Sequence, residues 1–222
     1  MPIKNEPRTI YDKGWIIRIR YPSDTINIKA LILLHGWTGD ENSMWIFARQ
    51  LPANFLIISP RGLIRANPTG YGWVRQSTGE WPGLAEFDSI ASLVMERLIN
   101  WFKEQRIRIV RFNLMGFSQG AALAHAITVL YPDYIEQTVC LAGFFPQPSA
   151  GYLLLPGQLA GHRIFIFHGT KDSVIPTEMV LREAYYLNQA GAEVIYCEEE
   201  VGHKLGTSCF NRMEDFLAYE RS

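Results

Sequence analysis

Short apolar runs recur along the chain and are separated by longer amphipathic segments. Most runs are continuously apolar and rich in β-branched and aromatic residues, which is typical of strands buried on both faces of a parallel sheet. In the first run, Trp15, Ile17 and Ile19 alternate with Ile16, Arg18 and Arg20, and this pattern indicates an edge strand. The predicted strands span residues 15–21, 29–36, 54–60, 111–118, 137–143, 162–169 and 193–197.

Helical periodicity fills the intervals between these runs. Residues 86–105 give the clearest case, because apolar positions recur there at spacings of three and four. Gly191 stands where a C-terminal glycine cap belongs, just after another amphipathic segment. Strands that alternate with helices predict an α/β fold, a mostly parallel sheet with helices on both faces, formed by one domain over residues 1–222. The remaining predicted helices span 42–51, 119–130, 176–190 and 207–219.

The charge balance narrows the function classes. Lys and Arg number 21 against 22 Asp and Glu, so the net charge of −1 argues against binding nucleic acid or anionic membranes by bulk charge. The N-terminus lacks the apolar core of a signal peptide, and no uncharged apolar run is long enough for a membrane helix. The three cysteines form no CxxC pair, and their odd number and wide spacing predict reduced thiols. We therefore expect a soluble, cytoplasmic protein without stable membrane insertion, whose oligomeric state the sequence leaves open.

The segment Gly116-Phe117-Ser118-Gln119-Gly120 fits the pattern GxSxG. An apolar run enters it and an Ala-rich helix leaves it, which is the context of a nucleophile elbow. Such a turn is so sharp that side chains two positions before and after the serine would collide, and this requires glycine at both places. The elbow would place Ser118 at a helix N-terminus, where backbone N–H groups favour developing negative charge. Ser118 is therefore the candidate nucleophile.

A serine nucleophile needs a base, and the base needs an acid that orients it. In α/β-hydrolases the chain order is serine, acid, histidine. His203 lies in a glycine-flanked loop after the last predicted strand and is the candidate base, while Asp172 follows the strand that ends near His168 and is the candidate acid. The remaining downstream histidines, which are His125, His162 and His168, are expected to be structural. Among the rival acids, Glu198, Glu199 and Glu200 are expected to lie on a solvated strand end, and Asp133 in a turn.

An oxyanion hole should complete such a site. One donor is expected to be the backbone N–H of Gln119, the residue after the nucleophile, and the other an N–H from the loop after the early strand at 29–36. That loop begins His35-Gly36-Trp37, and the Trp37 N–H is the expected donor. The same loop excludes a dinucleotide-binding Rossmann protein, because it reads HGWTGD and not GxGxxG.

The chain resembles the carboxylesterase/phospholipase family of α/β-hydrolases, the small cytosolic carboxylesterases and acyl-protein thioesterases. The resemblance spans about residues 29–217 and rests on LILLHGWTGDENS, SPRG, GFSQGAALA, FHGTKDSVIP and VGHKLG. It implies hydrolysis of carboxylic esters or thioesters with no metal and no cofactor. By position it implies Ser118 as nucleophile, Asp172 as acid and His203 as base, with Trp37 and Gln119 as oxyanion donors. Trp73 resembles the tryptophan that the family carries before its long helix.

Two departures limit what the resemblance implies about the substrate. The thioesterases have a shorter HGxGD where this chain has HGWTGD, and residues 59–73 do not match their proline- and methionine-rich loop. The resemblance therefore implies the reaction class but not a thioesterase substrate. Other chemistry on the same fold stays open: a small peptidase, an acyltransferase, a dienelactone-hydrolase-like enzyme or a non-catalytic binding protein.

The expected substrate is a small-molecule ester with a small to medium acyl group. Residues 143–162, where lidded lipases insert a helical cap, offer only about 20 residues, whereas one mean helix already takes about 11–12. We therefore predict no large cap domain. The predicted cleft is open and shallow, with walls formed by Trp37, Trp73, Phe144, Phe145 and Leu205.

Overall fold

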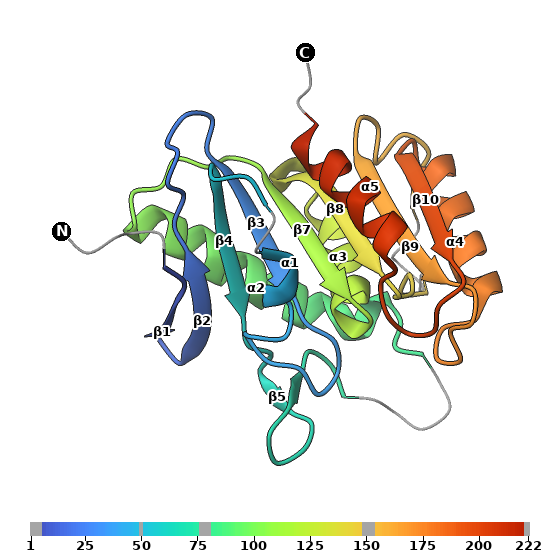
Figure 1. Ribbon diagram of the computed structural model, residues 1–222, viewed down its shortest axis with the longest axis horizontal. Helices are drawn as coiled ribbons and strands as arrows, with labels where there is room; N and C mark the ends of the chain where they lie inside the picture. The colour runs from blue at the N-terminus through green and yellow to red at the C-terminus, as the bar shows by residue number, and fades with distance from the viewer. Residues whose placement is uncertain (1–5, 49–50, 76–80, 148–153, 220–222) are drawn as a thin grey trace.

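The computed structural model describes residues 6–48, 51–75, 81–147 and 154–219. An eight-stranded sheet runs through the molecule in the order β1-β2-β4-β3-β7-β8-β9-β10 (Figure 1). The first two pairings, β1 with β2 and β2 with β4, are antiparallel, and all the others are parallel. The strands are β1 (Arg8–Asp12), β2 (Trp15–Arg20), β3 (Lys29–Leu34), β4 (Phe55–Pro60), β7 (Phe112–Phe117), β8 (Ile135–Leu141), β9 (Arg163–Gly169) and β10 (Glu193–Glu199).

Helices cover both faces of this sheet. In Figure 1, α1 and α5 lie in front of the strands, while α2 and α3 lie behind them. A small separate hairpin is formed by β5 (Ile64–Arg65) and β6 (Tyr71–Gly72). The helices are α1 (Trp45–Ala48), α2 (Leu84–Glu104), α3 (Gln119–Leu130), the 3-10 helix η1 (Pro132–Tyr134), α4 (Thr177–Gln189) and α5 (Thr207–Ala218).

Two apolar layers hold the helices onto the sheet. Every residue of β4 and β9 is buried, because these strands face a helix layer on either side. One layer packs α2, α3 and α4 against the sheet and includes Phe87 and Leu98; the other packs α1 and α5 and includes Trp45 and Phe216. Each buried side chain of this size contributes about 1.5–3 kcal/mol to folding. The arrangement confirms the predicted α/β fold with a mostly parallel sheet.

Several local predictions are corrected. The strand at 15–20 is not the edge strand, because β1 pairs outside it in an antiparallel hairpin. Its alternation arises because Trp15, Ile17 and Ile19 face the core while the intervening positions are only partly covered. The predicted helix at 42–51 is described only as Trp45–Ala48, and residues 49–50 lie outside the described part. The small hairpin was not predicted.

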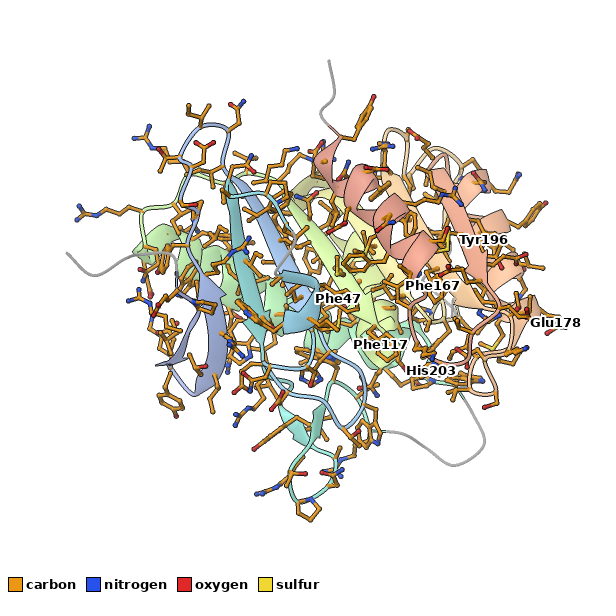
Figure 2. All side chains as sticks on the ribbon, viewed as in Figure 1. Phe47, Phe117, Phe167, Glu178, Tyr196 and His203 are labelled. Atoms are coloured by element: carbon orange, nitrogen blue, oxygen red, sulfur yellow. A yellow bond between two sulfur atoms is a disulfide. The ribbon has the colours of Figure 1, made fainter. Side chains whose placement is uncertain are left out.

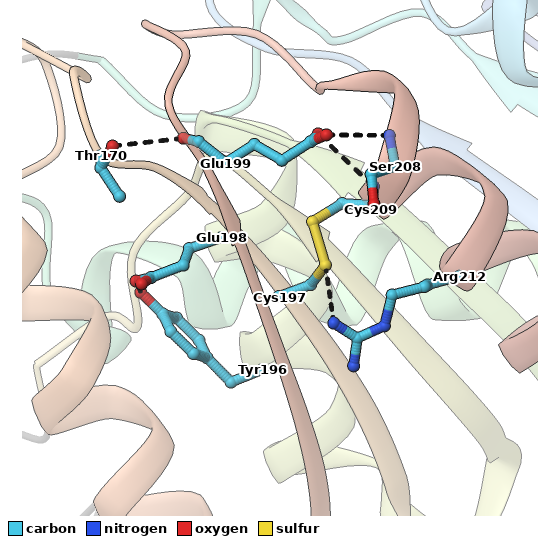
Figure 3. Close-up of a disulfide and its surroundings, with 8 residues drawn as sticks. All are labelled: Thr170, Tyr196, Cys197, Glu198, Glu199, Ser208, Cys209 and Arg212. Atoms are coloured by element: carbon cyan, nitrogen blue, oxygen red, sulfur yellow. Dashed lines mark hydrogen bonds between the residues drawn. A yellow bond between two sulfur atoms is a disulfide. The ribbon is translucent and has the colours of Figure 1, made fainter.

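The prediction of reduced thiols is wrong for two of the cysteines. Cys197, near the end of β10, forms a disulfide with Cys209 in the first turn of α5 (Figure 3). Glu199 makes a second link between the same elements, because its carboxylate accepts from the Ser208 N–H at 2.8 Å. Cys140 is a buried free thiol, and burial raises its pKa well above the ordinary value. The end of β10 and the start of α5 are thus tied together twice.

No helix in the described ranges is long and apolar enough to cross a membrane.

Candidate active site

The predicted site residues follow four parallel strands at one edge of the sheet. The loop with Trp37 follows β3, Ser118 follows β7, Asp172 follows β9 and His203 follows β10. Because the carboxyl ends of parallel strands share an edge, residues far apart in sequence come together there. The fold thus brings the sequence motifs to one place.

Ser118 occupies the apex of the turn between β7 and α3. Its backbone has φ 53° and ψ −118°, a left-handed conformation that costs a residue with a side chain about 1–3 kcal/mol. A Cβ on Gly116 would lie 2.1 Å from the Gly120 carbonyl oxygen, and one on Gly120 would lie 2.0 Å from the Leu34 carbonyl oxygen. Both glycines are therefore required by the close approach of backbone on either side of the serine.

The side chain of Gln119 fixes the neighbouring loop over this turn. It is buried, its Oε1 accepts from the Trp73 N–H at 2.7 Å, and its Nε2 donates to the Val74 carbonyl at 2.9 Å. The Gln119 backbone N–H lies in the first turn of α3, and none of the described groups accepts a hydrogen bond from it. That N–H is consequently free to bind an oxyanion, as is expected at a helix N-terminus.

His35 organises the loop that carries Trp37, a role that the sequence reasoning missed. Its buried ring accepts from the Gly62 N–H at Nε2, 2.8 Å away, and its Nδ1 lies 2.7 Å from the Gly36 carbonyl. Accepting at Nε2 leaves the proton on Nδ1, so the ring is neutral and donates to Gly36. Burial is the main cause that lowers the pKa of His35. The HG dipeptide hinted at a close turn but not at a bond to Gly62 across the sheet edge.

Asp172 and His203 form a hydrogen-bonded pair. The distance from His203 Nδ1 to Asp172 Oδ2 is 2.7 Å, and the carboxylate side chain is fully buried while the imidazole is 24% exposed. Oδ1 of Asp172 accepts from the backbone N–H groups of Val174 and Ile175. Burial acts to raise the pKa of Asp172, but the hydrogen bonds from His203 and from these N–H groups outweigh it and lower the pKa. The carboxylate is thus held ionised.

The His203 ring lies beside the elbow. Its centroid is 5.0 Å from that of Phe117, the residue before Ser118, and Figure 2 shows the two side chains next to each other. The remaining downstream histidines make other contacts. His125 lies 2.6 Å from buried Glu183, His162 bonds to the Pro132 carbonyl, and His168 bonds to Thr177. Asp172 has therefore paired with His203 and not with a rival histidine.

The predicted cleft wall needs correction at three positions. Trp73, Phe144 and Phe145 are 1%, 3% and 4% exposed and belong to the core behind the sheet. The indole N–H of Trp73 donates to the His35 carbonyl at 2.7 Å, which turns the ring inward. Phe144 packs between Trp81 and Phe87 instead of facing solvent. These aromatic residues support the loops and do not line the cleft. Residues 76–80 and 148–153, which follow them in the chain, lie outside the described part of the structure.

Trp37 and Leu205 do face a cavity, on the side of the sheet covered by α1 and α5. It has a volume of about 620 Å³. Its walls come from the Trp37 loop, from α1 and the residues before it, from Phe117, and from the segment after His203 into α5. The volume is within the range of small-molecule sites, roughly 300–1,000 Å³. No group of three or more His, Cys, Asp or Glu side chains suited to a metal ion occurs among the described residues.

An elbow serine, a hydrogen-bonded Asp–His pair with a buried carboxylate and a mostly parallel sheet define the class of α/β-hydrolases. Residues 19–221 match the phospholipase/carboxylesterase family, so the chain belongs to that family. It is 25% identical to a putative hydrolase of Bacillus subtilis over 88% of this chain and 90% of that protein. It is also 30% identical to acyl-protein thioesterase 1 of Saccharomyces cerevisiae over 67% of this chain and 72% of that protein.

Solved structures agree with this assignment at the level of the fold. A carboxylesterase from Mesorhizobium loti superposes with a TM-score of 0.82 over 96% of this chain and 98% of that one, at 20% identity. A carboxylesterase from Bacillus cereus gives 0.81 over 92% and 94%, at 21% identity. The chain is thus an esterase-type hydrolase with the α/β-hydrolase fold and no evident large cap in the described residues. The predicted family, fold class and general activity are confirmed.

Proposed function

We propose that Ser118, His203 and Asp172 form the catalytic triad of a serine esterase that acts on small to medium carboxylic esters. The observation that carries the proposal is the strained elbow of Ser118 beside the ring of His203, whose Nδ1 is held at 2.7 Å by buried Asp172. A serine hydroxyl is a weak nucleophile, and this arrangement supplies the base and the carboxylate that orients it.

The reaction follows from the groups at hand. His203 removes the Ser118 proton as Oγ attacks the ester carbonyl, and Asp172 stabilises the imidazolium that forms. The N–H groups of Trp37 and Gln119 donate to the developing oxyanion, a contribution typically worth about 2.7–4 kcal/mol for one donor. His203 then gives its proton to the leaving alcohol, and the acyl group stays on Ser118. A water molecule, deprotonated by His203, releases the acid and restores the serine.

No step of this mechanism requires a cofactor. The acyl-protein thioesterase among the relatives makes thioesters a second candidate substrate class for this chain. Residues 1–222 are proposed to act as one domain, and the cytoplasm stays the predicted location. That location no longer has support from the cysteines, because Cys197 and Cys209 are paired and disulfides are rare in the cytosol.

Labelling with a fluorophosphonate probe tests the nucleophile directly. Wild-type protein should be labelled and should hydrolyse p-nitrophenyl acetate, whereas Ser118→Ala should do neither, with a loss of activity of roughly 10⁶. Ser92→Ala is a matched control, because Ser92 lies on α2 and bonds to Tyr131 away from the elbow. Equal labelling of wild type and Ser118→Ala, with similar turnover, would remove Ser118 from the mechanism.

A further inference from the structure

We propose that the cavity between α1 and α5 binds the alcohol part of the ester and that this alcohol is uncharged and apolar. The inference rests on the proposed function, because it needs His203 as the group that protonates the leaving oxygen. It adds the substrate class, which neither the family nor the triad specifies.

Position is the first argument. The leaving oxygen has to lie within hydrogen-bond reach of His203 when it receives the proton. The groups that flank His203 also line the cavity: the Phe117 ring, 5.0 Å from the imidazole, and Leu205, two residues along the chain. An alcohol whose oxygen lies at His203 therefore has the cavity directly beside it.

The walls are apolar and come from two separate elements. Phe47 of α1 and Phe210 of α5 are nearly parallel, with ring centroids 6.0 Å apart and planes 28° apart. Met44, Phe117 and Leu205 complete an apolar lining around this stacked pair. Figure 2 shows Phe47 in front of the sheet on the same side as Phe117. Apolar surface of this kind favours alkyl or aryl groups, at about 25 cal/mol for each Å² removed from water.

Two of the polar groups near the cavity, Ser43 and the start of α5, already have partners inside the protein, whereas Lys204, the charged side chain in its wall, is exposed to solvent. Ser43 Oγ lies 3.0 Å from Asp40 Oδ1 and accepts from the Asp40 N–H. The start of α5 could attract an anion, but the N–H groups of Ser208 and Cys209 point to the Glu199 carboxylate (Figure 3). The carboxylate of Glu199 would also repel an anion there. A charged alcohol between the apolar walls would therefore lose water without gaining compensating bonds from Ser43 or from the start of α5.

Two series of unactivated esters separate the alcohol from the acyl group. In the first, the acyl group is acetyl and the alcohol grows from methyl to hexyl; in the second, the alcohol is methyl and the acyl group grows by the same steps. We expect kcat/KM to rise about two- to fourfold for each methylene of the alcohol, close to the full transfer of a CH₂ from water. The acyl series should rise less steeply.

Two variants change the cavity in opposite directions. Phe47→Ala enlarges it and should lower the ratio of kcat/KM for hexyl acetate over methyl acetate by roughly tenfold, while raising relative activity on naphthylmethyl acetate. Leu205→Trp fills it and should shift the preference toward methyl acetate. Tyr185→Ala is the matched control, because Tyr185 also belongs to an aromatic pair, with Tyr186, but lies 60% exposed on α4.

Each outcome decides the proposal. If the variants change the acyl series and leave the alcohol series as in wild type, the cavity binds the acyl group and the proposal is wrong. A flat alcohol series in wild type, together with fluorophosphonate labelling of Ser118, would overturn the proposal while the esterase mechanism stands. Absence of labelling would mean that the proposed function itself has failed, and the cavity assignment with it.

Discussion

The guanidinium of Arg61 binds the carboxylate of Glu41 through two hydrogen bonds, Nε to Oε2 at 2.6 Å and Nη2 to Oε1 at 2.8 Å. Glu41 lies in the segment after β3 and Arg61 follows β4, so the pair joins the Trp37 loop to the next loop along the sheet edge. Arg61 also lies over the ring of Tyr71, whose N–H donates to the Gly39 carbonyl at 2.8 Å. The proposed oxyanion donor Trp37 is thus held in place by contacts from a second loop.

Replacing Arg61 by Lys should lower kcat by about 10- to 100-fold with little change in KM. Lys keeps the charge but not the planar fork, so the Trp37 loop loses its fixed position. A displacement of about 1 Å at such a site can cost 100-fold in rate, and an oxyanion contact acts on the transition state more than on bound substrate. Steady-state kinetics with p-nitrophenyl acetate measure both constants.

Arg163→Lys is the matched control for this substitution. Arg163 also binds a glutamate, through Nε alone, which donates to Oε1 and Oε2 of Glu193 at 3.2 and 3.1 Å, and this pair lies at the opposite, amino-terminal end of β9 and β10. The Arg163→Lys variant should be less stable than the wild type but should have the same kcat. If both variants lower kcat equally, the Arg61 effect is one of general stability, and the positional role of the pair is wrong.

Much of the site was predictable because its chemistry requires certain residues at certain spacings. A side chain at Gly116 or Gly120 would place its Cβ only 2.1 or 2.0 Å from a backbone carbonyl oxygen, so a short motif carries a three-dimensional constraint. The order serine, acid, histidine led to the pair of Asp172 and His203, which the structure joins at 2.7 Å. Buried parallel strands were equally clear, because both of their faces have to be apolar.

What the sequence could not predict depends on contacts between distant segments. Glu41 and Arg61 are 20 positions apart, and His35 and Gly62 are 27 apart, so no periodicity links them. The prediction of the cleft wall was wrong at Trp73, Phe144 and Phe145 for a related reason. A tryptophan in a Gly-rich loop can face solvent or the core, and the choice at Trp73 depends on the bond of its indole to the His35 carbonyl.

Asp172→Asn should reduce kcat by roughly 10⁴ while leaving the fold intact. An amide at this position can donate to His203 Nδ1, which favours the tautomer that no longer accepts the serine proton. The measurement is kcat for an unactivated ester, with far-ultraviolet circular dichroism to monitor the fold.

Asp133→Asn is the corresponding control, because Asp133 lies in η1 after the serine's helix. Its kcat should stay within twofold of wild type. An Asp172→Asn enzyme that retains a tenth or more of wild-type kcat would rule out the proposed orienting role of the carboxylate.

The disulfide should stabilise the segment that carries His203. Cys197 and Cys209 are 12 positions apart, and His203 lies between them, so the bond closes a short loop around the proposed base. Cys197→Ser combined with Cys209→Ser should lower the free energy of unfolding by about 3 kcal/mol, the value for a loop of roughly 15 residues. Urea denaturation measures this loss, and esterase activity in the same variant reports on the position of His203.

A dithiol reductant should reproduce the effect in the wild-type protein. Cys140→Ala tests whether the reductant acts through this disulfide, because the variant lacks the free thiol and keeps the bond. The reductant should destabilise Cys140→Ala as much as wild type and leave the double serine variant unaffected. If the double variant is as sensitive as wild type, the reductant acts elsewhere.

Stability should fall with decreasing pH below about 6.5 because of His35. Burial lowers the pKa of His35, so the unfolded chain, with an ordinary histidine pKa of about 6.5, takes up the proton first. The unfolded state then binds more protons than the native state. The contribution of His35 to the free energy of unfolding is therefore fully present above about pH 6.5 and decreases as the pH falls toward the lowered pKa. Protonation would also break the bond in which Nε2 accepts from Gly62.

His35→Gln should flatten this dependence between about pH 6.5 and 5, although its stability at pH 8 should be lower. Burial also lowers the pKa of His168, so His168→Gln should flatten the curve independently, and the double variant should be flattest. Asp172 acts in a different window: its pKa is lowered, so its contribution is lost only below the ordinary aspartate value of about 3.9. Denaturant midpoints at half-unit pH intervals provide the measurement, and an unchanged slope in His35→Gln would refute the assignment to this ring.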